Sequence, residues 1–283
     1  MKLIEILPDD LLGFLPSRLI RHRLSVPGNI FFPGDRWTRV FLRGLCKLAT
    51  NGGLPGRVHE VGVGAGLVSL FVAGFGKDLS FSDLQPDAID VAESNIFRAL
   101  KASDRRRVRP VKGSTNLLSQ EGYICVPKIG TIIGCIPQVP ADGISLQDGD
   151  NMAHYYRADA VESKLNALGL GLNDGLLAEA VRLLPRGGKV VLNLGGRPGL
   201  ATLVRMFQAR GYRASVVYRE LVDQDPTTSL KTLAALEAAT GHGFEFFSDF
   251  QGRNKISAVE AEKFRLDGRK VFHYIYVVEG VLT

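Results

Sequence analysis

The sequence RVHEVGVGAG at residues 57–66, with the apolar LVSLFVAGF that follows it at 67–75, decides the fold. Its first five residues predict a strand and its last nine a helix, and the three glycines lie in the turn between them. Because glycine has no Cβ, the backbone can turn tightly there and a ligand can lie against bare amides. A strand, a glycine loop and a helix in this order are typical of the nucleotide-binding crossover in parallel α/β sheets.

Beyond this crossover, short apolar runs alternate with helical patterns along the chain. Such an alternation predicts an α/β fold in which a seven-stranded, mostly parallel sheet carries helices on both faces. In this arrangement ligands bind outside the carboxyl ends of the strands, where the strand order reverses. The expected strands lie near Arg57–Val61, Leu79–Asp83, Arg107–Lys112, Gly130–Cys135, Lys189–Leu194, Ala214–Arg219 and Val271–Val278.

The chain divides at a turn-rich segment, NGGLPG at residues 51–56. Residues 1–52 predict an N-terminal helical extension, a candidate lid, whose best amphipathic helix covers about Arg36 to Leu48. Residues 53–283 are expected to form the Rossmann-like catalytic domain. Before the last strand, residues 222–268 form an insertion with a helical pattern and an aromatic cluster. Connections usually have about 2–6 residues, so a segment of this length indicates a role of its own.

The composition is that of a folded globular chain. Its 283 residues include 35 Lys and Arg against 29 Asp and Glu, a net charge of +6, and 45% are hydrophobic. No apolar run approaches the roughly 20 residues of a membrane-spanning helix, and the first residues lack the features of a secretory signal. The three cysteines and five histidines have no metal-ligand spacing. We therefore expect a cytoplasmic protein with no metal and no membrane partner.

The positive charge raises the question of a nucleic-acid partner. The densest basic run, DRRRVR at residues 104–109, lies just before an expected strand and has no interleaved aromatic residues. Single-stranded nucleic acid is usually bound by such aromatic faces. We interpret the run as a solvated helix end and expect no nucleic-acid partner.

Two acids indicate which ligand the glycine loop binds. Glu60 precedes the loop and Asp83 follows the second expected strand. A carboxylate beside the loop would repel a pyrophosphate but suits a cationic ligand. S-adenosylmethionine (SAM) carries a sulfonium and an ammonium group and no phosphate, and Asp83 can accept hydrogen bonds from its ribose hydroxyls. The pattern favours SAM over NAD, and the structural alternative is a tight turn with solvent-exposed acids.

Further candidates lie after the later strands. Gln138 and Arg197 are candidates for the amino or carboxylate groups of a substrate, and Tyr155 and Tyr156 for a cation–π contact with the sulfonium. A turn or an aromatic core is the structural alternative for these positions, and Cys135 is expected to be a buried thiol, not a nucleophile. The residues expected to contact SAM are Glu60, Gly62, Gly64, Gly66, Asp83, Leu84, Ser114, Thr115, Asn116 and Cys135.

With these motifs, the chain resembles the class I SAM-dependent methyltransferases. More narrowly, it is similar to the methyltransferase domain of methionine S-methyltransferases and their bacterial relatives. The resemblance extends from about Val26 to Phe250 and implies the Rossmann-like class I methyltransferase fold, with SAM at Glu60, the glycine loop and Asp83, and a small amino acid near Gln138 and Arg197. The shared stretches are EVGVGAG at 60–66, DLQP at 83–86, IGCIPQ at 133–138, LGGRPG at 194–199 and HGFEFF at 242–247.

This resemblance leaves two reactions open. One is methyl transfer from SAM to the sulfur of methionine, giving S-methylmethionine. The other is cyclisation of SAM itself to azetidine-2-carboxylate and methylthioadenosine, as in the methyltransferase-like azetidine-2-carboxylate synthases. This chain has VPADG at 139–143 where the plant proteins continue with an asparagine–proline repeat, and Asn116 where they carry an acid. The changed loop slightly favours cyclisation.

Two different classes of protein also stay open. A methyltransferase acting on RNA or on another small molecule could carry the same SAM-binding motifs, and the RNA reaction would show salt-sensitive binding to polynucleotide. A SAM-binding protein without turnover would bind SAM and form no product with any acceptor.

Overall fold

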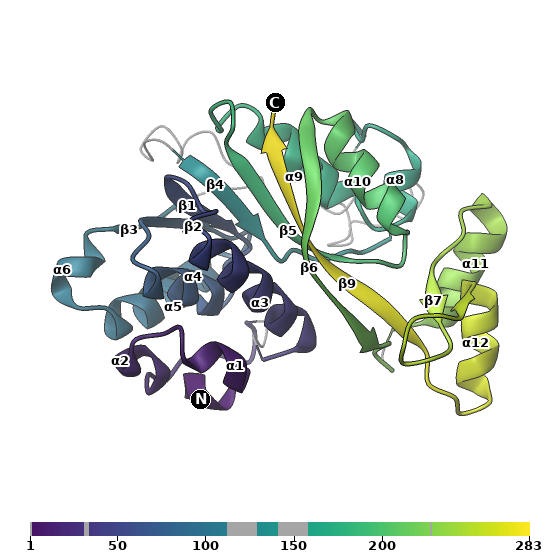
Figure 1. Ribbon diagram of the computed structural model, residues 1–283, viewed down its shortest axis with the longest axis horizontal. Coiled ribbons are helices and arrows are strands. Elements are labelled where there is room, and N and C mark those ends of the chain that lie inside the picture. The colour runs from purple at the N-terminus through teal and green to yellow at the C-terminus, as the bar shows by residue number, and fades with distance from the viewer. Residues whose placement is uncertain (1, 31–33, 112–128, 141–157, 227) are drawn as a thin grey trace.

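The computed structural model describes residues 2–30, 34–111, 129–140, 158–226 and 228–283. Its centre is one mixed sheet with helices on both faces, which Figure 1 shows nearly edge-on. Five of its strands run parallel in the order β3-β2-β1-β4-β5, so the strand order reverses between β1 and β4. These strands are β1 (Arg57–Val61), β2 (Leu79–Ser82), β3 (Val108–Pro110), β4 (Ile129–Gly134) and β5 (Lys189–Gly195).

The other side of the sheet is antiparallel. β9 (Phe272–Leu282) inserts between β5 and β6 (Tyr212–Asp223) and runs antiparallel to both. β7 (Phe246–Phe247) and β8 (Lys255–Ile256) extend the sheet beyond the start of β9. The Rossmann-like class I methyltransferase fold expected from the sequence is therefore confirmed.

Two details of the expected sheet are wrong. The sheet has nine strands instead of seven, because the insertion contributes the two-residue strands β7 and β8. β6 also continues to Asp223, well beyond the expected end at Arg219. Its pairing with β9 continues through this polar stretch, since Asp223 lies opposite Phe272. The length of β6 is therefore set by its backbone pairing with the long strand β9. No local sequence pattern encodes this pairing.

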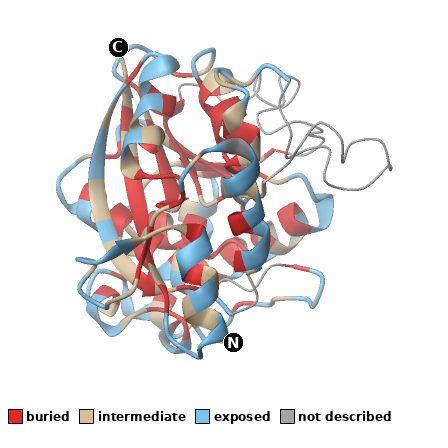
Figure 2. Ribbon diagram, turned by 90° about the vertical axis from the view of Figure 1, so that its right-hand side faces the viewer, coloured by how far each residue is buried: buried red, intermediate tan, exposed pale blue. Residues whose placement is uncertain are grey.

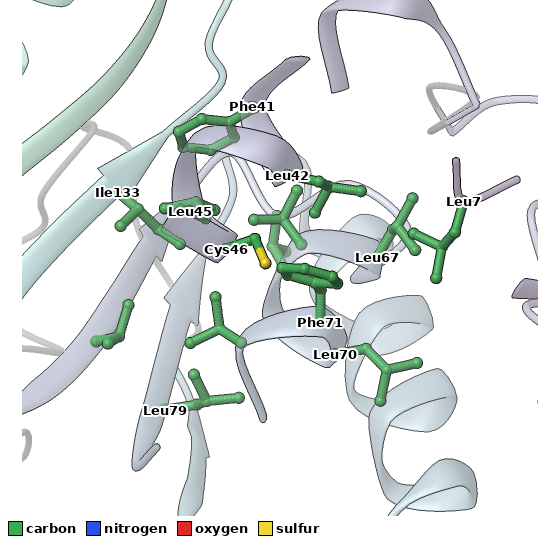
Figure 3. Close-up of a cluster of buried hydrophobic side chains, with 14 of the residues drawn as sticks. Leu7, Phe41, Leu42, Leu45, Cys46, Leu67, Leu70, Phe71, Leu79 and Ile133 are labelled. Carbon is green, nitrogen blue, oxygen red and sulfur yellow. The ribbon is translucent and has the colours of Figure 1, made fainter. Parts of the chain in front are cut away.

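One face of the sheet is covered by α3 (Arg36–Thr50), α4 (Leu67–Gly74) and α5 (Pro86–Ala99). Asp35 caps α3 by accepting a hydrogen bond from the Thr38 amide at 2.8 Å, and Val40, Phe41, Leu45 and Leu48 bury its apolar side. Figure 3 shows Phe41 and Leu45 of α3 in one apolar cluster with Phe71 of α4 and Ile133 of β4. Residues 1–52 therefore share a hydrophobic core with the sheet.

The short N-terminal elements pack below this face. Pro8 and Pro16 each directly precede a one-turn helix, where a proline costs no hydrogen bond. Leu11 and Leu19 from these helices are buried in the same cluster. The elements are η1 (Leu3–Glu5), α1 (Asp9–Leu12) and α2 (Ser17–Ile20), and α6 (Ala102–Arg105) lies at the far edge before β3.

The opposite face carries α8 (Lys164–Ala167), α9 (Gly171–Ala180) and α10 (Leu200–Ala209). In Figure 2 the buried residues concentrate on the strands and on the helix sides turned toward them. The insertion forms α11 (Leu230–Thr240), as expected, and α12 (Ala258–Leu266), which pack against each other beyond the start of β9. The sheet is thus sandwiched between two separate apolar layers, and its carboxyl edge is left for the site.

Candidate functional site

The glycine loop follows β1 at the point where the strand order reverses. Gly62, Gly64 and Gly66 have φ angles of +76°, +49° and +83°, a region that side chains rarely adopt. The Gly62 amide donates to Ser82 O at 3.0 Å, which ties the loop to the end of β2. A methyl group on Gly66 would also lie 3.1 Å from Ala92 of α5. The sequence therefore needs glycine here both for the turn and for close packing.

Asp83 lies at the end of β2 and faces this loop. Its Oδ2 accepts a hydrogen bond from the Gly64 amide at 2.9 Å, and its Oδ1 accepts from the Gln85 amide at 2.9 Å. Each carboxylate oxygen has a second lone pair, so both can still accept from a ligand. Leu84, next to it, is 48% exposed and offers an apolar surface at the same edge. Asp83 and Leu84 therefore place a hydrogen-bond acceptor and an apolar surface side by side at this edge of the sheet.

Glu60 is the buried acid of the site. Its side chain is 3% exposed, and Ser69 Oγ of α4 donates to its Oε2 at 2.5 Å. Burial raises the pKa of Glu60 to about 8, and the nearby Asp83 carboxylate adds to the rise, while the bond from Ser69 opposes it. A carboxyl group in such an environment gains greatly from a cationic ligand, because the cation favours its ionised form.

Cys135 directly follows β4. Burial raises the pKa of its thiol to about 12, although the Asn193 amide donates to Sγ at 3.3 Å. The thiol is therefore uncharged at neutral pH, and the residue is half-buried where the sequence predicted a buried thiol. Asn193 Nδ2 also donates to Trp37 O at 2.9 Å, which joins the start of α3 to β4 and β5.

Gln138 follows β4, and its amide group contacts β5 directly. Its Oε1 accepts from the Gly195 amide at 2.5 Å, and its Nε2 donates to Gly195 O at 3.4 Å. A methyl group on Gly195 would lie 2.6 Å from the Trp37 ring. The geometry thus shows Gln138 and Gly195 holding the two loops together beneath Trp37, and a contact of Gln138 with substrate stays a prediction.

Arg197 lies in the turn after β5. Burial lowers the pKa of its guanidinium to about 10. In the described part of the chain this group has no ion-pair or hydrogen-bond partner, although Arg197 O accepts from the Glu245 amide at 2.7 Å. Glu245 belongs to the HGFEFF stretch, so the insertion supports this turn. Arg197 is half-buried and keeps part of its contact with water, and its guanidinium has free donors with which a carboxylate could form charge-assisted hydrogen bonds.

His273, on β9, is a buried histidine near the turn after β5 that sequence reasoning did not single out. It is 2% exposed, and neither ring nitrogen has a partner in the regions that the structure describes. Its ring centroid lies 6.1 Å from that of Trp37. Burial, helped by the positive charge of Arg197, holds the pKa of His273 well below the usual value. No local signal marks this histidine, because only strand pairing brings it to Arg197.

Five expected contacts lie outside the described residues: Ser114, Thr115, Asn116, Tyr155 and Tyr156. The structure brings together the others, since Glu60, Asp83, Cys135 and Gln138 all follow or end neighbouring strands. Among the described residues no cluster of three or more His, Cys, Asp or Glu could hold a metal ion. None of the helices described has both the length and the apolar content to cross a bilayer.

Comparison with known proteins supports a link to methyltransferases. A methionine S-methyltransferase from Zea mays is 27% identical over 279 residues, which make up 90% of this chain and 25% of that protein. One from Arabidopsis thaliana is 26% identical over 298 residues, 96% of this chain and 27% of that protein. The chain spans about a quarter of the length of the curated relatives it matches. No protein-family model matches it.

Solved structures with a related chain path are more distant. A putative RNA methyltransferase from Pyrococcus horikoshii aligns over 92% of this chain and 94% of its own, with a TM-score of 0.49 and 11% identity. A SAM-dependent methyltransferase from Geobacter sulfurreducens, in complex with S-adenosyl-L-homocysteine, aligns over 83% and 90%, with a TM-score of 0.42 and 16% identity.

Proposed function

We propose that this chain is a SAM-dependent methyltransferase whose acceptor is the thioether sulfur of a small amino acid of the methionine type. The observation that carries the proposal is the presence of a buried acid, Glu60, and of a half-buried arginine, Arg197, which has no ion-pair partner among the described residues, at the same edge of the sheet. Glu60 suits the cationic end of SAM, and Arg197 suits a carboxylate. The names of the sequence relatives, all methionine S-methyltransferases, support this choice.

The residues at this edge fit SAM in charge and in hydrogen-bonding capacity. Asp83 would accept hydrogen bonds from the ribose hydroxyls, and Leu84 would pack against the adenine. Glu60 would ionise when a sulfonium or ammonium group approaches, and the bare amides of the glycine loop would allow close contact. When bound, SAM supplies an electrophilic methyl group on sulfur.

Methyl transfer to a thioether needs little acid or base catalysis by the protein. It has no proton to lose, so the protein needs no general base and accelerates the reaction mainly by aligning the two sulfur atoms with the methyl carbon. The uncharged thiol of Cys135 fits this requirement, because a thiolate there would compete for the methyl group. Trp37, placed over Gly195, would exclude water from the acceptor side.

Mass spectrometry of the purified chain with SAM, with and without L-methionine, tests the proposal. We expect S-adenosylhomocysteine and S-methylmethionine only when methionine is present. Methylthioadenosine and azetidine-2-carboxylate formed from SAM alone would replace the proposal by cyclisation. Retention of RNA at moderate ionic strength, together with methylation of that RNA, would replace it by an RNA methyltransferase.

A further inference from the structure

The turn after β5 and the start of β9 bring two unpartnered polar side chains together. β5 and β9 are antiparallel, with Gly195 opposite Ile275, and the Gly196 amide donates to Tyr274 O at 2.7 Å. Arg197 follows Gly196 in the turn and His273 precedes Tyr274 on β9, so this hydrogen bond brings the two residues close along the backbone. The charge of Arg197 acts on the imidazole of His273, which is consistent with this proximity.

The side chain of His273 belongs to the face of the sheet that α3 covers. Ile275 and Val277 of β9 lie in the apolar cluster of that face, and His273 has the same parity along the strand. Its ring is next to Trp37 of α3. On β5, Gly195 faces Trp37, whereas Gly196 faces the Tyr276 ring on the opposite side. Arg197 lies in the turn that follows, directly after these two glycines.

The hydrogen-bonding capacity of this pair is complementary to an anion. A guanidinium has five N–H donors, and a neutral imidazole has one N–H donor and one acceptor. His273 is 2% exposed, and within the described residues both of its nitrogens lack a partner. An unsatisfied group at this depth loses its bonds to water without compensation. A carboxylate could accept from Arg197 in a bidentate manner and also from the His273 ring.

The position of the pair separates it from the SAM-binding residues. Asp83 follows β2 and Arg197 follows β5, with β1 and β4 between them. Three strand spacings of about 4.8 Å place these strand ends roughly 14 Å apart. Glu60, near the end of β1, is the nearer partner for the amino-acid end of SAM. An acceptor amino acid bound on the far side of β4 from Asp83 would bring its carboxylate to Arg197.

We infer that Arg197 and His273 form a subsite for the α-carboxylate of the acceptor amino acid, with His273 as a positioning residue that orients this group through its ring N–H. This inference rests on the proposed function, because it assumes an acceptor distinct from SAM. The same geometry explains why the guanidinium has no acidic partner among the residues described: the ligand supplies the counter-charge. Trp37 covers the subsite from α3.

Calorimetry on the full chain saturated with S-adenosylhomocysteine tests the subsite without turnover. The titrants are L-methionine and 3-(methylthio)propylamine, which lacks the carboxylate. We expect the native protein to bind methionine about ten- to a hundredfold more tightly than the amine, the range of charge-assisted hydrogen bonds. In Arg197→Met this preference should disappear. In His273→Phe, which keeps the ring beside Trp37, it should decrease, and His273→Asn should restore part of it.

Arg219→Met is the matched control. This arginine lies over the Tyr274 ring at 5.3 Å, on the other face of the sheet, and its loss should leave the preference unchanged. Thermal melting of each variant identifies unfolded protein. If His273→Phe does not fold, the preference for methionine over the amine in Arg197→Met and in His273→Asn still tests the inference. An unchanged preference for methionine in the folded Arg197 and His273 variants would overturn the inference.

The same titrations distinguish a subsite for the carboxylate of the acceptor from a subsite for the carboxylate of the cofactor. If Arg197→Met weakens binding of S-adenosylhomocysteine about tenfold or more, the subsite holds the cofactor's own carboxylate and the inference is wrong. The outcomes also distinguish the inference from the proposed function. Carboxylate-dependent binding of methionine without methyl transfer would refute only the function, and methyl transfer that is insensitive to both residues would refute only the subsite.

Discussion

At the scale of single residues, the candidate site contains two ionisable groups, Glu60 and Arg197, whose charged forms burial disfavours when no ligand is bound. Glu60 is buried, and its pKa is raised to about 8, so it is largely protonated at neutral pH. Arg197 is half-buried, with its pKa lowered to about 10, and it stays charged. A cationic group near Glu60 and a carboxylate near Arg197 would each stabilise the ionised form of one of these side chains. Groups with such perturbed pKa values are candidates for functional sites.

Glu60 predicts how SAM binding depends on pH. If Glu60 must ionise in the complex, affinity should rise about tenfold per pH unit between pH 6 and 7.5, because less free energy is needed to remove the proton. Calorimetry in two buffers of different ionisation enthalpy should show about one proton released per SAM bound near pH 6.5. Glu60→Gln should bind SAM more weakly and without this slope; a flat profile in the native protein would contradict the role of Glu60.

At the scale of elements, α3 connects the N-terminal region to the site. It packs on β9 through Gly44, where an added methyl group would lie 2.6 Å from a Val277 side-chain carbon. Its first turn places Trp37 over Gly195 and beside His273. We propose that residues 1–52 act as a lid only in this sense, as a fixed cover over the acceptor side. The distance between α3 and the sheet then controls the shape of the site.

Gly44→Ala tests this dependence. Alanine favours helices, but the methyl group must push α3 away from Val277, and overpacking of this kind costs about 1–3 kcal/mol. We expect a lower free energy of unfolding in urea and a higher KM for the acceptor, because Trp37 shifts with the helix. Gly13→Ala, at a position with no atom within 4 Å of the added methyl group, is the control and should stay within about 0.5 kcal/mol of the native protein. Equal stability of the two variants would show that the contact is not tight.

At the scale of the whole molecule, three buried titratable groups set the response to acid. His59 lies inside the sheet between Ser80 Oγ at 2.9 Å and Ser82 Oγ at 3.1 Å, and burial lowers its pKa to about 3. The pKa of His273 is also lowered, whereas that of Glu60 is raised. Between pH 6.5 and 4.5, the unfolded chain binds protons at both histidines, while the folded chain binds one at Glu60.

The sum of these effects predicts acid destabilisation of the ligand-free protein. Each histidine lowers the free energy of unfolding by about 1.4 kcal/mol per pH unit as pH falls through this window, and Glu60 raises it by about the same amount. The net loss from these three groups is about 1.4 kcal/mol per unit, and His22, whose pKa burial also lowers, adds to it; urea denaturation at pH 6.5, 5.5 and 4.5 measures the total. His59→Asn removes one histidine, so its slope should be smaller than that of the native protein by about 1.4 kcal/mol per unit; an unchanged slope would show that His59 titrates in the folded state.

The sequence by itself determined the crossover, the parallel strands and the positions of the two acids beside the glycine loop, whose contacts with SAM are still a prediction. Local rules suffice for these features, because the glycine loop, the apolar runs and the residues after each strand lie in one short window each. It also indicated Arg197 as a carboxylate contact, a role that is still a prediction. The insertion and its helix at Leu230–Thr240 were likewise visible as a pattern.

Only the tertiary structure decided how long β6 is, that β7 and β8 extend the sheet, and which groups lie next to Arg197. These features depend on pairing between segments far apart in the chain: β9 brings His273 to the turn after β5, and α3 brings Trp37 to both. Desolvation, which shifts the pKa values of Glu60 and His273, likewise exists only when distant segments have closed around them.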